Sequence, residues 1–375
     1  MKIQPFKLER FFARFEFTVP FLLCCSDCEA ISQKELLQLA DEDSLEMWND
    51  LKLGYTESLG HPVLREEITS LYKTVSPENV LVVIPEEGIY ITMNTVLREG
   101  DHVITTFPGY QSLYEIAYSL NCEVSRWCPE EKDGKWLFNL NSLRSLIKDN
   151  TRLVVINFPH NPTGAILESH ELESLANLLR EKSIILFSDE MYRFLEYDNE
   201  DRLVSACDMY DNAVSLFGMS KSFALAGLRI GWLTTKNTDL YQQCALYKDY
   251  TTICSSAPSE ILAIMALRVR EKILERNLNI IKNNLRLLDN FFKEYSEIFS
   301  WNRPKAGPIA FPKLNAEVNI EDFCLDLIEK KGVLLLPSNL YDYEGNNFRI
   351  GFARKNMPQA LNKLKEYIRE YYNKK

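Results

Sequence analysis

Residues 213–233 read AVSLFGMSKSFALAGLRIGWL and place two cations beside apolar runs. The run AVSLFG is typical of a buried strand, and Lys221 follows it after a short turn. Arg229 comes eight residues later, at the head of the second apolar run, RIGWL. Because a lysine is seldom fully buried unless it is paired or used, this pair of cations is the first candidate for a functional site.

Apolar runs that alternate with helical patterns extend from this segment toward the N-terminus. The runs are NVLVVI, DHVITTF, RLVVINF and SIILF, and an amphipathic stretch follows each of the first three. This alternation predicts an α/β fold whose mostly parallel sheet is flanked by helices on both faces. Residues 260–298 have helical spacing, and the remaining C-terminal part has an α+β pattern. We therefore expect a large domain over residues 45–260, and a small domain formed by residues 1–44 together with 261–375.

Composition argues against several classes of protein. The formal net charge of −10 is unsuited to coating nucleic acid, and no apolar run is long enough to predict a membrane span. The N-terminal residues mix charges with aromatics, so we interpret them as mature protein and not as a signal peptide. The nine cysteines suit free thiols in a reducing compartment, and we expect a cytoplasmic protein. We expect no metal site, since the four histidines are scattered and Cys24, Cys25 and Cys28 have no second pair beside them.

Polar side chains follow most of the predicted strands, at the sheet edge where open parallel sheets bind ligands. They are Tyr110 after HVITTF, Asn161 after RLVVINF, Asp189 and Tyr192 after SIILF, and Lys221 after AVSLF. Each of them alone has an ordinary explanation as a turn, a helix cap or a rim residue. Together they match the needs of pyridoxal phosphate: an amine for its aldehyde, a carboxylate for its ring nitrogen, donors for its hydroxyl and an aromatic face for its ring. Arg229 adds a cation for its phosphate.

Six motifs in order resemble the class I/II aminotransferases, which are pyridoxal-phosphate enzymes of fold type I. The resemblance covers most of the chain and is carried by YTESLGHPVLREEI, REGDHVITTFPGYQSLY, NFPHNPTG, SDEMY, MSKSFALAGLRIGW and NFRIGFA. Six ordered motifs are far more specific than any one of them. The resemblance implies a large α/β domain with a smaller α+β domain, and pyridoxal 5′-phosphate as cofactor.

The resemblance also implies roles for the residues that face the cofactor ring. Lys221 is expected to form the Schiff base and then to move the proton between Cα and C4′. Asp189 would pair with the pyridine nitrogen. Tyr192 and Asn161 would hydrogen-bond the phenolic oxygen, and Tyr110 would stack on the ring. Lys221, Asp189 and Tyr192 are therefore the predicted catalytic residues.

Further roles concern the phosphate and the substrate. Arg229 and Ser220 would bind the phosphate, and Tyr55 would reach a phosphate in the neighbouring subunit, which implies a homodimer with shared sites. Arg349 would hold the substrate α-carboxylate in a bidentate fork, with Asn161 beside it.

The chain departs from the family pattern at the phosphate. Gly218 stands where the family usually has a serine, and the usual small-residue turn reads Pro85-Glu86-Glu87. We include Glu86 and Glu87 among the cofactor-binding candidates, since the start of a helix still offers N–H groups. Their carboxylates would repel a phosphate unless they point away. The family's N-terminal glycine segment, which closes over substrate, has no recognisable counterpart.

The leading hypothesis is a pyridoxal-phosphate-dependent aminotransferase that moves an amino group from an α-amino acid to a 2-oxo acid. The alternative is a lyase or amino-acid cyclase on the same fold, since YTESLGHP resembles specialised members such as capreomycidine synthase. A non-catalytic binding module is a third hypothesis, which the joint presence of Lys221, Asp189, Tyr192 and Arg349 disfavours. A nicotinamide dehydrogenase is excluded because no G-x-G occurs.

Overall fold

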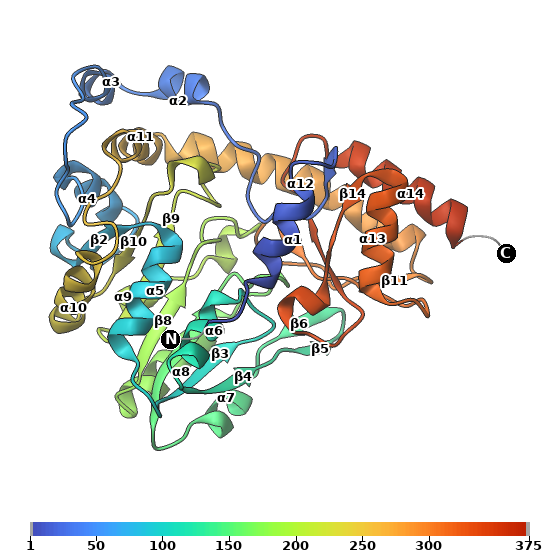
Figure 1. The fold of residues 1–375 in the computed structure, drawn as a ribbon, viewed down its shortest axis with the longest axis horizontal. Helices are drawn as coiled ribbons and strands as arrows, with labels where there is room; N and C mark the ends of the chain where they lie inside the picture. The colour runs from blue at the N-terminus through green and yellow to red at the C-terminus, as the bar shows by residue number, and fades with distance from the viewer. Residues whose placement is uncertain (1–2, 373–375) are drawn as a thin grey trace.

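A seven-stranded sheet forms the centre of the computed structural model, which describes residues 3–372 (Figure 1). In spatial order its strands are β2 (Val80–Val83), β10 (Gly231–Thr234), β9 (Ala213–Gly218), β8 (Ile185–Asp189), β7 (Thr151–Asn157), β3 (His102–Thr106) and β4 (Glu123–Trp127). Only β10 runs antiparallel to its neighbours in this sheet. The predicted mostly parallel sheet is confirmed, and all six apolar runs named above contribute its strands.

Helices cover both faces of the sheet, as the alternation predicted. Successive residues of β7 belong to two different apolar clusters: Leu153 and Val155 pack with α5 and α6, whereas Val154 and Ile156 pack with α8. The helices of the described residues are α1 (Lys7–Phe15), α2 (Gln33–Leu39), α3 (Glu42–Asn49), α4 (Pro62–Thr69), α5 (Pro85–Val96), α6 (Ser112–Ser119), α7 (Leu140–Leu146), α8 (Ser169–Glu181), α9 (Ala206–Met209), α10 (Thr238–Lys248), α11 (Ala257–Arg268), α12 (Arg270–Glu294), α13 (Ile320–Lys331) and α14 (Met357–Tyr371). None of them is long and apolar enough to cross a membrane.

The C-terminal elements gather on the other side of the molecule from the large sheet (Figure 1). They contain a three-stranded sheet in the order β12 (Ile309–Ala310), β16 (Phe348–Gly351) and β15 (Leu336–Pro337). The remaining strands form pairs: β1 (Phe21–Leu22) with β14 (Val333–Leu334), β11 (Phe299–Ser300) with β13 (Lys313–Leu314), and β5 (Glu130–Lys132) with β6 (Lys135–Leu137). The pairing of β1 with β14 joins the N-terminal segment to the C-terminal part. The division into two domains at the expected boundaries stays a prediction.

Helix α1 lies between the large sheet and the C-terminal elements (Figure 1). Its first residue is tied to both: the Lys7 N–H donates to the Gln111 side chain at 2.9 Å, and the Lys7 amine is ion-paired with Asp342. Leu8 and Phe11 bury the apolar side of the helix. The first turns of the chain are thereby held over the carboxyl ends of the sheet strands.

Candidate active site

A cavity of about 350 Å³ opens at the carboxyl ends of β7, β8 and β9. Most of the predicted site residues line it together: Glu86, Tyr110, Asn161, Asp189, Tyr192, Ser220, Lys221, Arg229 and Arg349. Tyr55 and Glu87 do not line it. The cavity also receives residues from the N-terminal segment that sequence reasoning missed, namely Leu8, Glu9, Phe12, Glu16, Cys25, Ser26 and Asp27.

Lys221 stands just beyond the end of β9, as the opening motif predicted. Its Nζ donates a hydrogen bond to the Ser26 hydroxyl at 2.9 Å. The next residue, Ser222, anchors the turn by donating to the Met191 and Arg193 carbonyls at 3.3 and 2.6 Å. Burial lowers the pKa of the Lys221 amine, since the charged form loses its hydration. The amine is thus held in a fixed place, and its lowered pKa makes the nucleophilic, neutral form more accessible than in a free lysine.

Asp189 ends β8 with its carboxyl group in the cavity. One oxygen accepts a hydrogen bond from the Met191 N–H at 3.1 Å, and Asn157 fixes the backbone by donating to the Asp189 carbonyl at 3.0 Å. Burial raises the pKa of this carboxyl to about 7. A buried carboxyl with so few donors suits a cationic or N–H-bearing ligand group, which would stabilise its charged form.

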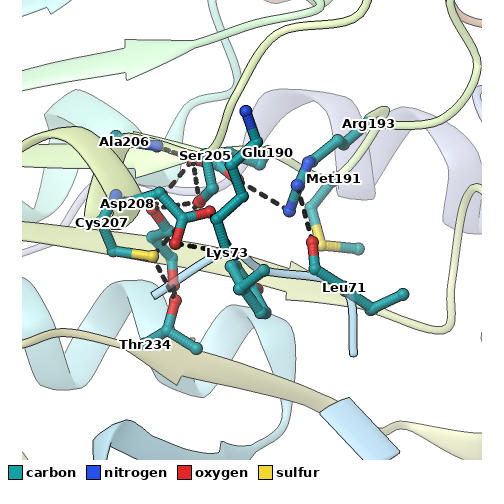
Figure 2. A network of polar contacts seen from close by, with 12 residues as sticks. Leu71, Lys73, Glu190, Met191, Arg193, Ser205, Ala206, Cys207, Asp208 and Thr234 are labelled. Carbon is teal, nitrogen blue, oxygen red and sulfur yellow. Dashed lines mark hydrogen bonds and ion pairs between the residues drawn. The ribbon is translucent and has the colours of Figure 1, made fainter. Parts of the chain in front are cut away.

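The neighbouring Glu190 points away from the cavity into a buried polar network (Figure 2). Its Oε1 accepts hydrogen bonds from the Ser205 hydroxyl, the Ala206 N–H and the Ser215 hydroxyl at 2.8–2.9 Å. Arg193 lies 3.8 Å from its other oxygen. Since adjacent residues of an extended chain face opposite sides, this network fixes the orientation of Asp189.

Arg349 projects from β16 and is only 1% exposed. Its Nε donates to the Cys24 carbonyl at 3.1 Å, and its Nη1 donates to Asn161 Oδ1 at 3.3 Å. Its Nη2 has no hydrogen-bond partner among the described residues. Asn161 is itself placed by the bond from its N–H to the Asn157 side chain at 2.8 Å. An unpartnered guanidinium nitrogen in a cavity wall is suited to bind a carboxylate of a ligand.

The two carboxylates of the Pro85-Glu86-Glu87 turn take different directions. Glu87 folds back to accept from the Ile84 N–H at 3.1 Å and from the Thr252 N–H and hydroxyl at 3.2 and 2.7 Å. Glu86 remains in the cavity wall, where it is hydrogen-bonded by the Ser112 hydroxyl. Burial raises the pKa of the Glu86 carboxyl. Both carboxylates of this turn are therefore engaged by protein donors.

Gly218 is required by close packing at the end of β9. A Cβ at this position would lie 2.8 Å from the Gly231 Cα, 2.9 Å from the Ile230 carbonyl oxygen and 3.2 Å from Pro85. The Gly231 Cα and the Ile230 oxygen are backbone atoms, and displacing them would cost free energy because they belong to the sheet region. The serine that the family usually has here does not fit beside Pro85 and β10, so the two departures from the family pattern are linked.

Two tyrosines differ in their surroundings. Tyr110 lines the cavity and packs against Phe6, with ring centroids 5.0 Å apart and the planes tilted by 51°. Tyr55 is 94% exposed on the loop that precedes α4. Tyr55 does not line the cavity of its own chain. This is the position expected of a residue that reaches the cavity of a neighbouring subunit.

The residues that sequence reasoning missed lie on the N-terminal side of the cavity. Ser26 accepts the bond from Lys221, and Asp27 is bound by Arg354 at 2.8 and 3.0 Å. Glu9 and Glu16 come from α1 and its C-cap. The sequence FFARFEF contains one signal that could have found Glu16. A carboxylate between aromatic residues is not favoured by apolar packing, which points to another role.

The sequence matches the family "Aminotransferase class I and II" over residues 34–364. The chain belongs to this family. It is 29% identical to an aspartate aminotransferase of Sulfurisphaera tokodaii over 331 residues, which are 84% of this chain and 82% of that protein. It is 28% identical to capreomycidine synthase of Streptomyces vinaceus over 298 residues, 79% of this chain and 75% of that protein.

Two solved structures are similar over almost the whole chain. A PLP-dependent aminotransferase from Streptococcus suis has a TM-score of 0.93 and 31% identity, with all of both chains covered. The PLP-dependent cyclase OrfR has a TM-score of 0.90 and 25% identity, covering 99% of this chain and 98% of that one. The fold is therefore that of the fold type I enzymes, and the cofactor of this family is pyridoxal phosphate. The cavity fits this cofactor, since it combines a half-buried amine, a buried carboxyl short of donors, a tyrosine ring and two guanidinium groups.

Proposed function

We propose that this chain is a pyridoxal-phosphate-dependent aminotransferase that moves an amino group from an α-amino acid to a 2-oxo acid. One observation carries the proposal: Lys221, Asp189 and the unpartnered Nη2 of Arg349 line the same cavity. These groups meet three separate needs of the reaction, namely an amine, a partner for the ring nitrogen and a partner for the substrate carboxylate. Membership of the aminotransferase family supports the same reaction.

The cofactor would be held by residues from several strand ends. Asp189 would pair with its ring nitrogen, Asn161 and Tyr192 would donate to its ring oxygen, and Tyr110 would cover its ring. The phosphate would lie between Arg229, Ser220 and the N-terminus of α5, where backbone N–H groups and the helix dipole favour an anion. When bound, pyridoxal phosphate supplies an electron sink for the bonds at the substrate Cα.

The chain itself handles the substrate and the proton. Arg349 would bind the α-carboxylate through Nη2, and its other nitrogens are already fixed by Cys24 and Asn161, so the fork is oriented before substrate arrives. Lys221 Nζ would take up the proton that the substrate Cα releases. Burial lowers the pKa of this amine toward the range that suits a general base, and Ser26 holds the nitrogen in place.

A second candidate is a lyase or amino-acid cyclase that uses the same cofactor. The similarity to capreomycidine synthase and to the cyclase OrfR favours it specifically. The two candidates differ in their products: transamination consumes a 2-oxo acid, whereas elimination and cyclisation do not. Product analysis with and without a 2-oxo acid separates them.

We also propose that the protein works as a homodimer in a reducing, cytoplasmic compartment. Exposed apolar side chains cluster where the loop before α4 meets the end of α10, and the two segments are joined by the Thr56 hydroxyl, which donates to the Ser255 carbonyl at 3.2 Å. These side chains are Leu53, Tyr55, Leu246, Tyr250 and Ile253, each more than half exposed. A second subunit would cover them and bring Tyr55 to its cavity.

All nine cysteines are free, which agrees with a reducing compartment.

The test is the absorption spectrum of the purified holoenzyme with amino acids added one at a time and no 2-oxo acid. Conversion of the cofactor band to that of pyridoxamine phosphate supports the amino-transfer half-reaction. Lys221→Ala is expected to abolish the conversion while circular dichroism stays unchanged. Conversion at the wild-type rate in this variant would contradict the assignment of Lys221.

A further inference from the structure

The side of the cavity formed by α1 is acidic. Glu9 lies on the first turn of the helix and Glu16 is its C-cap residue, and both line the cavity together with Asp27. Asp27 is ion-paired with Arg354, whose Nη2 lies 2.8 and 3.0 Å from its two carboxylate oxygens. Within residues 3–372, the carboxylates of Glu9 and Glu16 form neither a hydrogen bond nor an ion pair. Glu9 is exposed at the mouth of the cavity and Glu16 is half-buried, and neither carboxylate has a partner within the described part of the protein.

The cations that line the cavity have other partners in the proposed function. The lining residues include three of them, Lys221, Arg229 and Arg349. In the proposed function Lys221 serves the cofactor aldehyde, Arg229 the phosphate and Arg349 the α-carboxylate. None of them remains to neutralise Glu9 and Glu16, and none remains to bind a second carboxylate of a substrate.

Glu16 occupies a position that folding alone would not favour. The C-terminal end of a helix carries a partial negative charge, so a carboxylate there is repelled. Burial, and then the charges of Asp27 and Glu9, raise the pKa of Glu16, and the opposing charges of Arg354 and Lys221 do not outweigh them. A cation entering the cavity would relieve this repulsion.

We propose that the amino acid bound in this cavity carries a cationic side chain, an ammonium or guanidinium group, which is received by Glu9 and Glu16. The unpartnered Nη2 of Arg349, on a side chain 1% exposed, independently indicates that a ligand with a carboxylate belongs in the same cavity. The substrate then lies with its α-carboxylate on Arg349 and its distal cation toward α1. This inference rests on the proposed function and adds a substrate class to it.

Binding of three carboxylates to the enzyme loaded with pyridoxamine 5′-phosphate tests the charge preference without turnover, because this form of the cofactor has no aldehyde for an amine to attack. Valerate, 5-aminovalerate and glutarate share a five-carbon chain and differ in their distal group, which is neutral, cationic or anionic. We expect 5-aminovalerate to bind about tenfold more tightly than valerate, as measured by calorimetry, because two partly exposed ion pairs give an effect of this size. Glutarate is expected to bind more weakly than valerate. Equal or reversed affinities would overturn the proposal.

Variants of the two carboxylates test which residues are responsible. The double variant Glu9→Gln with Glu16→Gln is expected to reduce the preference for 5-aminovalerate to less than threefold and to leave valerate binding unchanged. Glu173→Gln removes the same kind of charge from an exposed position on α8, outside the cavity, and should keep the full preference. A double variant that keeps the tenfold preference would show that these residues do not receive the cation.

The spectral panel distinguishes failure of this inference from failure of the proposed function. Ornithine, norvaline and glutamate are compared for conversion of the cofactor band by the holoenzyme. Conversion by ornithine at a higher kcat/KM than by norvaline supports both proposals. Conversion by norvaline or glutamate but not by ornithine keeps the aminotransferase and overturns the cationic substrate. Turnover of ornithine without conversion to pyridoxamine phosphate keeps the substrate class and overturns the aminotransferase.

Discussion

Restoring the family's usual serine at Gly218 should destabilise this protein instead of improving it. The new Cβ would lie 2.8 and 2.9 Å from backbone atoms of Gly231 and Ile230. Overpacking of this kind costs about 1–3 kcal/mol, because backbone held in a central sheet cannot shift freely. Serine restricts the unfolded chain more than glycine, which returns about 0.5–1 kcal/mol. Because both short contacts are to backbone atoms, the upper end of the first range applies, and we expect Gly218→Ser to lower the free energy of unfolding by about 2 kcal/mol.

The assay is thermal unfolding of the cofactor-free protein, followed by circular dichroism. For a chain of 375 residues this loss corresponds to a Tm about 2–3 °C lower. Gly227→Ser is the matched control, because a Cβ at Gly227 meets no atom within 4 Å. The control is expected to unfold within about 1 °C of the wild type. If both variants unfold at the same temperature, the explanation of Gly218 by close packing is refuted.

Three further predictions concern charged groups of the site. Arg349→Lys should raise KM for amino acids by about tenfold or more, since lysine cannot replace the fork; steady-state kinetics that match the wild type would assign the carboxylate to another residue. Glu190→Ala should lower the free energy of unfolding by about 3 kcal/mol or more, measured in urea, because it leaves buried donors unpaired; a loss below 1 kcal/mol would contradict the anchoring role of the network. Folding raises the pKa of Asp189 to about 7, so the cofactor-free protein gains stability from this group below about pH 4 and loses it as pH rises to about 7. This pH dependence of the free energy of unfolding amounts to up to about 4 kcal/mol, and it is measured by urea unfolding at low and at neutral pH. Asp189→Asn should remove it. A variant with the same pH profile as the wild type would contradict the raised pKa of Asp189.

The sheet could be predicted from the sequence where burial is complete. The runs that form β2, β3, β7, β8 and β9 are mostly apolar because both faces of each strand are covered by helices. Strand β4 gave no such signal, since it lies at the sheet edge and exposes Glu123 and Arg126. Strand β10 is short and antiparallel, and its place between β2 and β9 depends on long-range pairing that no local pattern reports.

The half of the site expected to face the cofactor was likewise predictable. Its residues follow strand ends, and parallel strands bring their carboxyl ends to a common edge. The direction of a side chain at that edge was not predictable. Glu86 and Glu87 are neighbours in sequence, yet one lines the cavity and the other folds back onto Thr252, because the packing of α10 and the loop after it decides which donors each carboxylate meets.

The other half of the site comes from a segment that no motif connects to Lys221. Ser26 accepts its hydrogen bond across 195 residues of sequence, and the carboxylates of Glu9 and Glu16 reach the cavity only because α1 is held between the large sheet and the C-terminal elements. The chemistry of the cofactor demands fixed residue types, which leaves a pattern in the sequence. A substrate side chain demands only a complementary charge, which any acidic residue on the right face of α1 supplies. The charge on this helix is therefore the feature of this chain from which its substrate class is proposed.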